Sequence, residues 1–261
     1  MPKILITGHR GYIASSLYTY LKDTYDVTVL GRDELDLTDS FKVNEWFIGK
    51  HFDVVIHTAI TGGHRLIPDN ATVMDANLRM YYNLLDNRKS YTRFLNIGSG
   101  AELHNLDTPY GLSKSIIAKS ISERDNFYNI RAYAVFDENE LPTRFIKMSI
   151  TNYIKKEPIV ITLDKHMDFF YMKDFVRLIK YYITAESPAK LTDCAYSNSP
   201  SLKNIANKIN SLSNYHEVNI QLIADGMANH YCAPFPRNNL PIELCGWEKG
   251  IELTYEALCN R

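Results

Sequence analysis

Short apolar runs alternate with longer amphipathic segments through the first two thirds of the chain. The short runs are apolar throughout rather than at every second position, which is typical of strands covered by helices on both faces. This alternation predicts an α/β fold, a Rossmann-like doubly wound parallel sheet. The predicted strands are residues 3–7, 27–30, 53–58, 93–98 and 130–136, and the predicted helices are residues 13–21, 40–47, 71–85 and 113–121.

The alternation ends after Asp137. The pattern then predicts a helix over 142–155, a short strand over 159–163, and a segment over 174–183 that is a candidate to return to the sheet. A last portion begins near Pro200 and contains two Pro-rich connections. We therefore expect a Rossmann domain and a smaller C-terminal lobe. The domain is predicted to comprise residues 1–139 and 167–199, and the lobe residues 140–166 and 200–261.

Composition and charge narrow the class of protein. The 261 residues are 45% hydrophobic and 23% charged, which is typical of a globular protein with a large core. The formal net charge of −1 gives no reason to expect nucleic acid or a membrane surface as a partner. No apolar run approaches the roughly 20 residues that span a bilayer, and the first residues lack the pattern of a signal peptide. The four cysteines have no C-x-x-C spacing, so we expect a cytoplasmic protein without a metal site.

Residues 7–14 read TGHRGYIA and join the first predicted strand to the first predicted helix. Gly8 allows a tight turn, Gly11 lets the backbone approach a pyrophosphate, and Ala14 is small enough for close packing of helix on strand. Tyr12 and Ile13 begin the helix, whose N-terminus attracts an anion. Glycines are also common in ordinary strand-to-helix turns, but the place of this pattern after the first strand favours a dinucleotide.

The end of the second predicted strand bears on the choice of cofactor. Arg32 follows that strand, and Arg10 projects from the glycine-rich loop towards the same region. Two arginines can form charge-assisted bonds with the 2′-phosphate of NADP. The alternative is that Arg32 is solvated and Asp33 accepts the ribose hydroxyl of NAD. The pattern favours NADP(H).

Tyr110 and Lys114 lie four residues apart on a predicted helix, so their side chains share one face. A nearby ammonium stabilises the phenolate and lowers the pKa of a tyrosine from about 10, which makes it a usable general acid. Ser99 follows the fourth predicted strand, at the edge where ligands bind in open α/β sheets. These three residues predict a catalytic set.

The chain resembles the extended short-chain dehydrogenase/reductases, also called the NAD-dependent epimerase/dehydratase family. The segments that resemble the family are GHRG (8–11), RDELDLTD (32–39), TAITGG (58–63), Asn77 in a helix, FLNIGS (94–99) and CGW (245–247).

The resemblance implies that the Rossmann domain binds NADP(H), the cofactor, and that the smaller lobe binds a nucleotide sugar, the substrate. It implies that Arg10 and Arg32 hold the 2′-phosphate and that Ser99, Tyr110 and Lys114 are the catalytic triad. The other implied contacts are Asp36 and Leu37 with the adenine, Thr58, Ala59 and Ile60 with the ribose and phosphates, Asn77 with the cofactor, and Arg237 with the substrate diphosphate.

Some positions depart from the branch of the family that epimerises and reduces 4-keto-6-deoxy nucleotide sugars. There the catalytic serine is followed by a serine and a cysteine that acts in epimerisation, but here Gly100 and Ala101 follow Ser99. The partner histidine of that chemistry aligns with Arg144. Met167 stands where a substrate arginine is usual, and Ser99 and Tyr110 are only 11 residues apart. The sequence therefore predicts an NADPH-dependent ketoreductase of a nucleotide-activated 4-keto-6-deoxy sugar.

Two other functions stay open. A bifunctional epimerase-reductase, or another epimerase or dehydratase, would exchange protons through Arg144, His64 or solvent. A non-catalytic NADP-binding regulator would use the same fold without turnover. Gly63 and His64 lie in a loop over the expected substrate cleft, where they are either substrate contacts or surface residues. His57, at the end of an apolar strand, is expected to be a core histidine.

The helices expected at 71–85 and 109–126 are apolar over more of their circumference than one sheet-facing stripe requires. A second apolar side needs a second partner. The resemblance implies a four-helix bundle between two subunits, so we expect a homodimer. The alternative is that the small lobe covers this side within one subunit. The residues concerned are Val73, Met74, Leu78, Tyr81, Tyr82 and Leu85 on the first helix and Ile116, Ile117, Ala118 and Ile121 on the second.

Overall fold

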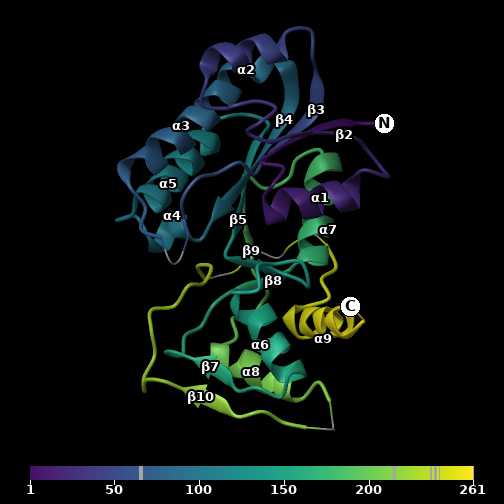
Figure 1. The fold of residues 1–261 in the computed structure, drawn as a ribbon. Helices are drawn as coiled ribbons and strands as arrows, with labels where there is room; N and C mark the ends of the chain where they lie inside the picture. Colours follow the sequence, from purple (N-terminus) through teal and green to yellow (C-terminus); the bar gives the residue numbers. More distant parts are fainter. Residues whose placement is uncertain (65–66, 214–215, 236, 238–239, 241, 261) are drawn as a thin grey trace. The chain divides into compact units, whose positions relative to one another are not determined.

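The computed structural model describes residues 1–64, 67–213, 216–235, 237, 240, 242–260 (Figure 1). The chain divides into two compact units. The first comprises Met1–Arg131 and Tyr182–Thr192, and the second comprises Ala132–Tyr181 and Asp193–Arg261. The predicted assignment of the cofactor to a Rossmann domain and of the substrate to a smaller lobe stays a prediction.

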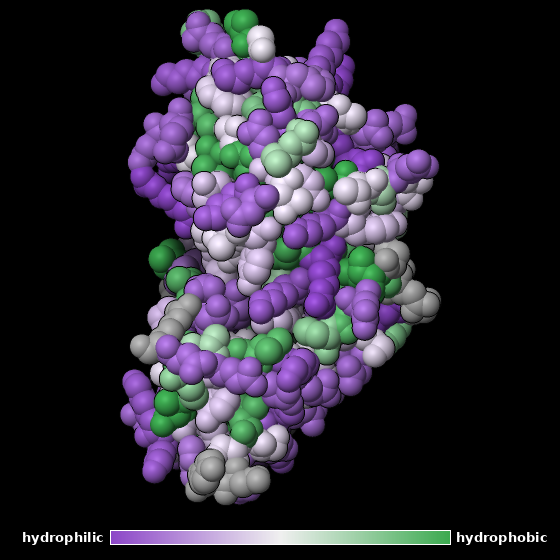
Figure 2. Space-filling view, turned by 90° about the vertical axis from the view of Figure 1, so that its right-hand side faces the viewer, coloured by the Kyte–Doolittle hydropathy of each residue, from purple (hydrophilic) through white to green (hydrophobic). Residues whose placement is uncertain are grey.

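Hydrophilic side chains predominate on the face shown in Figure 2, where hydrophobic side chains form small separate groups. Within the described ranges, no helix is both long enough and apolar enough to cross a membrane.

The first unit contains a six-stranded sheet of order β2-β1-β3-β4-β5-β9. β1 pairs in parallel with β2 and with β3, and β3 pairs in parallel with β4. The strand order reverses between β1 and β3, which is the topology of a doubly wound sheet. The predicted Rossmann-like fold is confirmed. The strands are β1 (Lys3–Thr7), β2 (Asp26–Leu30), β3 (Phe52–His57), β4 (Tyr91–Ser99), β5 (Phe127–Ala132) and β9 (Leu191–Cys194).

Helices α2, α3 and α5 lie on one face of this sheet and α1 on the other (Figure 1). The side chains of Asp39, Asn70 and Thr108 accept backbone N–H groups in the first turns of α2, α3 and α5. Such caps satisfy donors that have no partner within the helix. The helices and short turn here are α1 (Tyr12–Leu21), α2 (Ser40–Phe47), α3 (Ala71–Asp86), η1 (Arg88–Ser90), α4 (Ala101–His104) and α5 (Pro109–Ser122).

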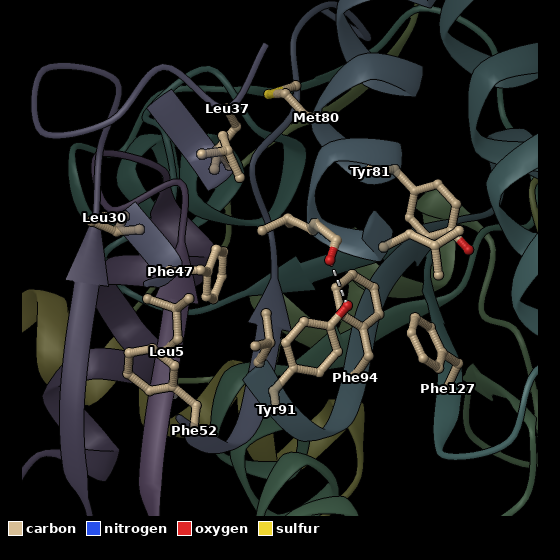
Figure 3. Close-up of a cluster of buried hydrophobic side chains, with 14 of the residues drawn as sticks. Leu5, Leu30, Leu37, Phe47, Phe52, Met80, Tyr81, Tyr91, Phe94 and Phe127 are labelled. Atoms are coloured by element: carbon tan, nitrogen blue, oxygen red, sulfur yellow. Dashed lines mark hydrogen bonds between the residues drawn. The ribbon is translucent and has the colours of Figure 1, made fainter. Parts of the chain in front are cut away.

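A cluster of buried aliphatic and aromatic side chains fills the space between the sheet and helices α2, α3 and α5 (Figure 3). Phe94 and Phe127 stack with ring centroids 5.0 Å apart. The Tyr91 hydroxyl donates a hydrogen bond of 2.8 Å to the carbonyl oxygen of Leu84, so this buried polar group has a partner. Burying a large apolar side chain stabilises a fold by about 1.5–3 kcal/mol, so this core holds β4 firmly in the sheet.

The second unit contains two small parallel pairs, β6 with β8 and β7 with β10. Ser201 and Asn204 form a capping box at the start of α8. The elements are β6 (Ala134–Phe136), α6 (Phe145–Ile154), β7 (Ile159–Ile161), β8 (Phe169–Tyr171), α7 (Met172–Thr184), α8 (Leu202–Asn210), β10 (Ile220–Leu222) and α9 (Trp247–Cys259).

Two predictions of local structure are wrong. The strand expected over 130–136 breaks at Tyr133, because β5 ends at Ala132 and β6 pairs with β8 instead of joining the large sheet. The segment 174–183 is part of helix α7, and β9 is the strand that returns to the sheet. The apolar residues of α7 recur with a helical period of three to four, which outweighs their high β-propensity.

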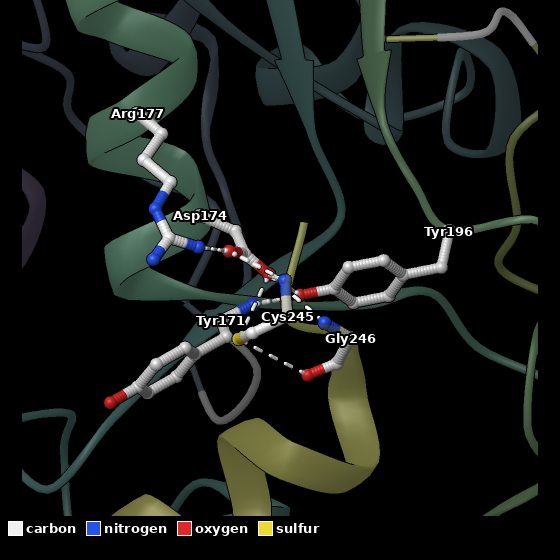
Figure 4. Close-up of polar contacts among 6 residues, drawn as sticks. All are labelled: Tyr171, Asp174, Arg177, Tyr196, Cys245 and Gly246. Carbon is white, nitrogen blue, oxygen red and sulfur yellow. Dashed lines mark hydrogen bonds and ion pairs between the residues drawn. The ribbon is translucent and has the colours of Figure 1, made fainter. Parts of the chain in front are cut away.

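Asp174 on α7 joins several polar groups at the start of α9 (Figure 4). Its carboxylate accepts the backbone N–H groups of Cys245 and Gly246 at 3.1–3.2 Å and the Tyr196 hydroxyl at 2.7 Å. It also pairs with Arg177 at 2.8 Å. The buried carboxylate thus holds the backbone immediately before α9, at Cys245 and at the N-cap residue Gly246.

Candidate active site

The glycine-rich loop lies between β1 and α1. Gly8 has φ +80°, and a Cβ atom there would be 2.8 Å from the Cα of Ala59. Its N–H donates to the carbonyl oxygen of Leu30 at 2.8 Å, and its own carbonyl accepts the N–H of Gly11 at the same distance. No side chain caps α1, and its first turn holds no acid. A backbone cradle at an uncapped helix N-terminus fits the pyrophosphate of a dinucleotide.

The structure brings Arg10 to the region after β2, as its projection from the loop predicted. There it forms an ion pair with Asp33, in which both side chains are largely exposed. Arg32 is exposed as well. Hydrogen bonds from Thr38 lower the pKa of Asp36, and Arg32 contributes to the same shift. Arg10, Arg32 and Asp33 therefore lie in the same region after β2. The structure alone does not choose between the arginines, which would bind a 2′-phosphate, and Asp33, which would accept a ribose hydroxyl.

The segment after β3 carries three of the predicted cofactor residues. Thr58 donates to the carbonyl oxygen of Thr7 at 2.7 Å, and the N–H of Ala59 donates to the Thr7 hydroxyl at 3.3 Å. These bonds fix the segment beside Gly8, while Ile60 is exposed.

Two further predicted cofactor residues are buried. The side chain of Asn77 accepts the N–H of Thr61 at 2.8 Å and donates to its carbonyl oxygen at 3.0 Å. It also donates to the Ser113 hydroxyl at 3.1 Å. Leu37 belongs to the hydrophobic core. Asn77 therefore positions the loop after β3, whatever else it contacts.

Tyr110 and Lys114 lie on α5, and the Lys114 ammonium is 6.0 Å from the centroid of the Tyr110 ring. Lys114 is buried and donates to the carbonyl oxygen of Ile97 at 2.8 Å. Burial lowers the pKa of Lys114 to about 8, and the negative charge of Glu102 acts in the opposite direction. A buried cation beside a phenol favours the phenolate, which is the arrangement that a tyrosine general acid needs.

Ser99 ends β4, two residues after the carbonyl that holds Lys114. Its hydroxyl accepts the N–H of Ala101 at 3.2 Å. Its backbone N–H donates to Glu102 at 2.9 Å. The hydrogen bond from Lys114 to Ile97 thus connects α5 to the end of β4, where Ser99 lies.

Sequence reasoning missed Glu102, whose side chain is buried and paired with Arg131 at 3.0 Å. Asn129 donates to the same carboxylate oxygen at 2.9 Å. Burial raises the pKa of the Glu102 carboxyl, and Arg131, the Ser99 N–H and Lys114 act against that shift. No signal in the sequence indicated this pair, because the predicted strand 130–136 placed Arg131 at its start, whereas Arg131 lies near the end of β5.

His57 at the end of β3 is buried, as predicted for a core histidine. Its Nδ1 lies 2.9 Å from the Thr7 hydroxyl. Burial lowers the pKa of His57 to about 3, and the Lys114 charge acts in the same direction. The imidazole is therefore neutral beside the lysine.

The loop that precedes α3 reaches Tyr110. A Cβ atom on Gly63 would lie 3.0 Å from the Tyr110 ring, so this backbone contacts the predicted general acid. His64 is exposed, and Arg65 lies outside the described residues. Gly63 is thus placed at the candidate site, whereas the contact of His64 with substrate stays a prediction.

The other predicted substrate residues belong to the second unit. Arg144 precedes α6, with its Nε 3.9 Å from the buried carboxylate of Glu140. Burial raises the pKa of Glu140 to about 8. Arg237 makes a bidentate pair with Asp168 at 2.8 and 3.0 Å and also donates to the Ser199 hydroxyl. Its guanidinium is thus already engaged within this unit.

Among the described residues, no group of three or more His, Cys, Asp or Glu side chains could hold a metal ion. The groups assembled at the end of β4 are instead a phenol, an ammonium, a hydroxyl and a buried ion pair. Together with the cradle at Gly8, these are the groups that a dinucleotide-binding protein with acid–base chemistry at the sheet edge would need.

The model of the NAD dependent epimerase/dehydratase family matches residues 4–191, which is most of the chain. The protein belongs to this family. A search of curated protein sequences found no match.

Solved structures share the fold at low identity. A UDP-glucose 4-epimerase from Thermotoga maritima has a TM-score of 0.81 at 16% identity, covering 99% of both chains. A GDP-L-fucose synthetase from Naegleria fowleri bound to NADP has a TM-score of 0.76 at 16% identity, covering 99% of this chain and 93% of that one. A GDP-mannoheptose C4 reductase from Campylobacter jejuni with NADP bound has a TM-score of 0.77 at 15% identity, covering 99% and 98%.

Proposed function

We propose that the protein is an NADPH-dependent ketoreductase of a nucleotide-activated 4-keto-6-deoxy sugar, with a reaction similar to the reducing half of GDP-L-fucose synthase. The observation that carries this proposal is the fixed pair of Tyr110 and Lys114. Lys114 is locked to the end of β4, where Ser99 lies, and Tyr110 contacts the Gly63 loop. Family membership and the glycine cradle support the use of a nicotinamide dinucleotide.

The cofactor, when bound, supplies the hydride. Residues of the chain donate the proton and bind the carbonyl oxygen of the substrate. Tyr110 donates a proton from its hydroxyl to the carbonyl oxygen of the substrate, and Ser99 donates a hydrogen bond to the same oxygen. Lys114 stabilises the phenolate left on Tyr110 by its positive charge.

The residues after Ser99 favour reduction without epimerisation. Inverting a carbon next to a ketone needs groups that remove and return a proton on opposite faces. Gly100 and Ala101 have no side chain that can do so. We therefore propose no deuterium uptake beside the ketone when the reaction runs in deuterium oxide. Uptake at those carbons would show that epimerisation accompanies reduction.

Arg10 and Arg32 support a preference for NADPH over NADH. Both are exposed at the end of β2, and a 2′-phosphate would compete with Asp33 for Arg10. The fucose synthetase and the heptose reductase named above were solved with NADP, whereas a similar NDP-hexosamine 5,6-dehydratase is NAD dependent. Asp36, Thr58 and Ala59 would complete the site, with Asn77 holding the loop that carries the latter two.

We also propose that the protein is a homodimer through α3 and α5. Tyr82 on α3 is 41% exposed and Leu112 on α5 is 40% exposed, while Val73, Tyr81 and Leu85 are buried in the subunit. The two exposed side chains would pack against the same helices of a second copy. Light scattering should give about 60 kDa, twice the 30.0 kDa chain. A fully active 30 kDa species would exclude the dimer as a requirement.

The substrate can be tested without knowing the nucleotide. A thermal-shift screen with NADP present would compare GDP-, UDP-, dTDP- and CDP-activated sugars. A ligand at 100 times its dissociation constant adds about 2.7 kcal/mol of stability, which gives a clear shift. The 4-keto form of the stabilising sugar should then oxidise NADPH. Cofactor binding without turnover on any such sugar would favour a regulator instead.

A further inference from the structure

Two buried side chains hold the last three residues of β4. The Lys114 ammonium donates to the carbonyl oxygen of Ile97 at 2.8 Å. The backbone N–H of Ser99 donates to Glu102 Oε1 at 2.9 Å. The backbone that carries the Ser99 side chain is therefore fixed between a buried cation and a buried anion.

Gly98 lies between these two contacts and makes room for the carboxylate. A Cβ atom at this position would overlap with Glu102 Oε1 and would lie 2.7 Å from Asn129 Oδ1. Glu102 therefore contacts the backbone at the end of β4, and only a glycine at position 98 leaves room for this contact.

The second oxygen of Glu102 faces two more donors. Oε2 accepts Asn129 Nδ2 at 2.9 Å and Arg131 Nε at 3.0 Å. The side chains of Arg131 and Glu102 are 8% and 2% exposed. These partners all donate, which is the pattern of an ionised carboxylate.

The charged groups around this carboxylate come from two neighbouring elements. Arg131 faces it from the end of β5, and Lys114 faces it from α5. His57 faces Lys114 from β3 and is neutral. Glu102 is thus a negative charge that faces a buried cation on each of these two elements.

We propose that Glu102 is a positioning residue for the reaction, which holds Ser99 through its backbone N–H and supplies the negative charge opposite the Lys114 ammonium. This inference rests on the proposed function for its kinetic consequence. Its structural part, the hold on Ser99 and the charge facing Lys114, stands without it.

Removing the Glu102 charge should change the pH at which Lys114 loses its proton. Burial already lowers the pKa of Lys114 to about 8, and Glu102 opposes this shift. Without the opposing charge the pKa falls further, so the ammonium is lost at a lower pH. An opposite charge near an ionisable group is worth about one pKa unit.

Two variants separate the two roles. Glu102→Gln removes the charge at nearly constant size, and Glu102→Asp keeps the charge but withdraws it by one methylene. Glu123→Gln is the matched control, because Glu123 is an exposed glutamate paired with Lys119 near the end of α5. We expect the basic limb of kcat to move down by about one pH unit in Glu102→Gln. It should stay in place in Glu102→Asp and in the control.

Two readouts need no turnover. Amide hydrogen exchange at Ser99 should be at least about tenfold faster in Glu102→Asp than in the control, since the shorter side chain withdraws its oxygen from the N–H. In protein labelled with 13C at lysine Cε, the Lys114 resonance, assigned by its loss in Lys114→Arg, should titrate near pH 8. In Glu102→Gln it should titrate about one unit lower.

Each part can be overturned separately. Unchanged exchange at Ser99 in Glu102→Asp would refute the hold on the backbone, and an unchanged titration of Lys114 in Glu102→Gln would refute the charge. If Glu102→Gln does not fold, Glu102→Gln combined with Arg131→Gln removes one anion and one cation and is compared in the same way. Failure of the proposed function would show as no turnover in the unaltered protein, with both of these readouts intact.

Discussion

Two buried carboxylates, Glu102 in the first unit and Asp174 in the second, look alike by burial and hydrogen bonding. Each is at most 3% exposed, and each accepts backbone N–H groups and pairs with an arginine. Their neighbours differ. Glu102 faces the buried Lys114, whereas Asp174 faces the hydroxyl of Tyr196 and the thiol of Cys245.

The difference lies in which neighbours can change charge near neutral pH. Burial brings the pKa of Lys114 to about 8. Burial and the Asp174 charge raise the pKa of Cys245 to about 11 and raise that of Tyr196 as well, so both stay protonated. Burial alone therefore does not identify a site. A buried carboxylate beside a group that titrates in the working range is the better indicator.

The comparison predicts that removal of a tyrosine hydroxyl lowers activity at the candidate site and lowers stability in the Asp174 cluster. Tyr110→Phe removes the proposed general acid, so kcat should fall about 100-fold or more with NADPH affinity little changed. Tyr196→Phe is the matched variant of the other cluster, and it should lower thermal stability while kcat stays within about twofold. Steady-state kinetics with calorimetry of cofactor binding would check both. Equal turnover in Tyr110→Phe would end the assignment.

Cofactor binding should depend on the first unit through Arg10. Arg10→Ala removes one charge-assisted contact with a 2′-phosphate, which costs about 1.5–3 kcal/mol or roughly 10- to 150-fold in affinity for NADPH. NADH lacks that phosphate, so its affinity should hardly change. Arg79→Ala, which alters an exposed arginine on α3, is the control. Similar dissociation constants for both cofactors in the unaltered protein would refute the preference.

The pH dependence of turnover should report Lys114. The lysine is charged below its pKa and loses its proton as the pH rises, so kcat should fall about tenfold per unit above pH 8. The thiol of Cys245, whose pKa is about 11, should contribute nothing in this range. A flat kcat between pH 7 and about 10 would show that Lys114 is not needed in its charged form.

The smallest effect on activity should come from the second carboxylate. Asp174→Asn leaves the N–H groups of Cys245 and Gly246 and the Arg177 charge with a weaker acceptor. We expect a loss of about 2 kcal/mol in the free energy of unfolding and no shift of the kcat profile. Asp75→Asn, at an exposed ion pair, is the control for denaturant unfolding. A shifted profile in Asp174→Asn would mean that the two clusters are not as distinct as we argue.

The parts of the fold that follow local rules could be predicted from the sequence. The apolar runs before residue 100 became strands within a few residues, because each is bounded by turn residues and followed by a helix. The segment 130–136 could not be predicted as two strands, since its break at Tyr133 depends on pairing with β8, more than 30 residues away. The segment 174–183 differs, because the helical period of its apolar residues can be read from the sequence and predicts α7 without knowledge of its packing.

The part of the candidate site that could be predicted is the part in which the spacing of residues along a helix determines which side chains lie close together. Tyr110 and Lys114 share a helix face because they are four residues apart. Glu102 was not predicted, because its burial depends on Arg131, which is distant in sequence and close only through the sheet. The pairing of Arg237 with Asp168 was missed for the same reason.

The measurement that tests the proposed ketoreductase most directly is transfer of deuterium. NADPH carrying deuterium at C4 of the nicotinamide would be incubated with the 4-keto-6-deoxy sugars of the four nucleotides, and the products analysed by mass spectrometry. We predict one sugar product that is heavier by one deuterium at C4, formed with stoichiometric oxidation of NADPH and lost in Tyr110→Phe. Cofactor binding with no deuterium in any sugar product would contradict the proposed reaction.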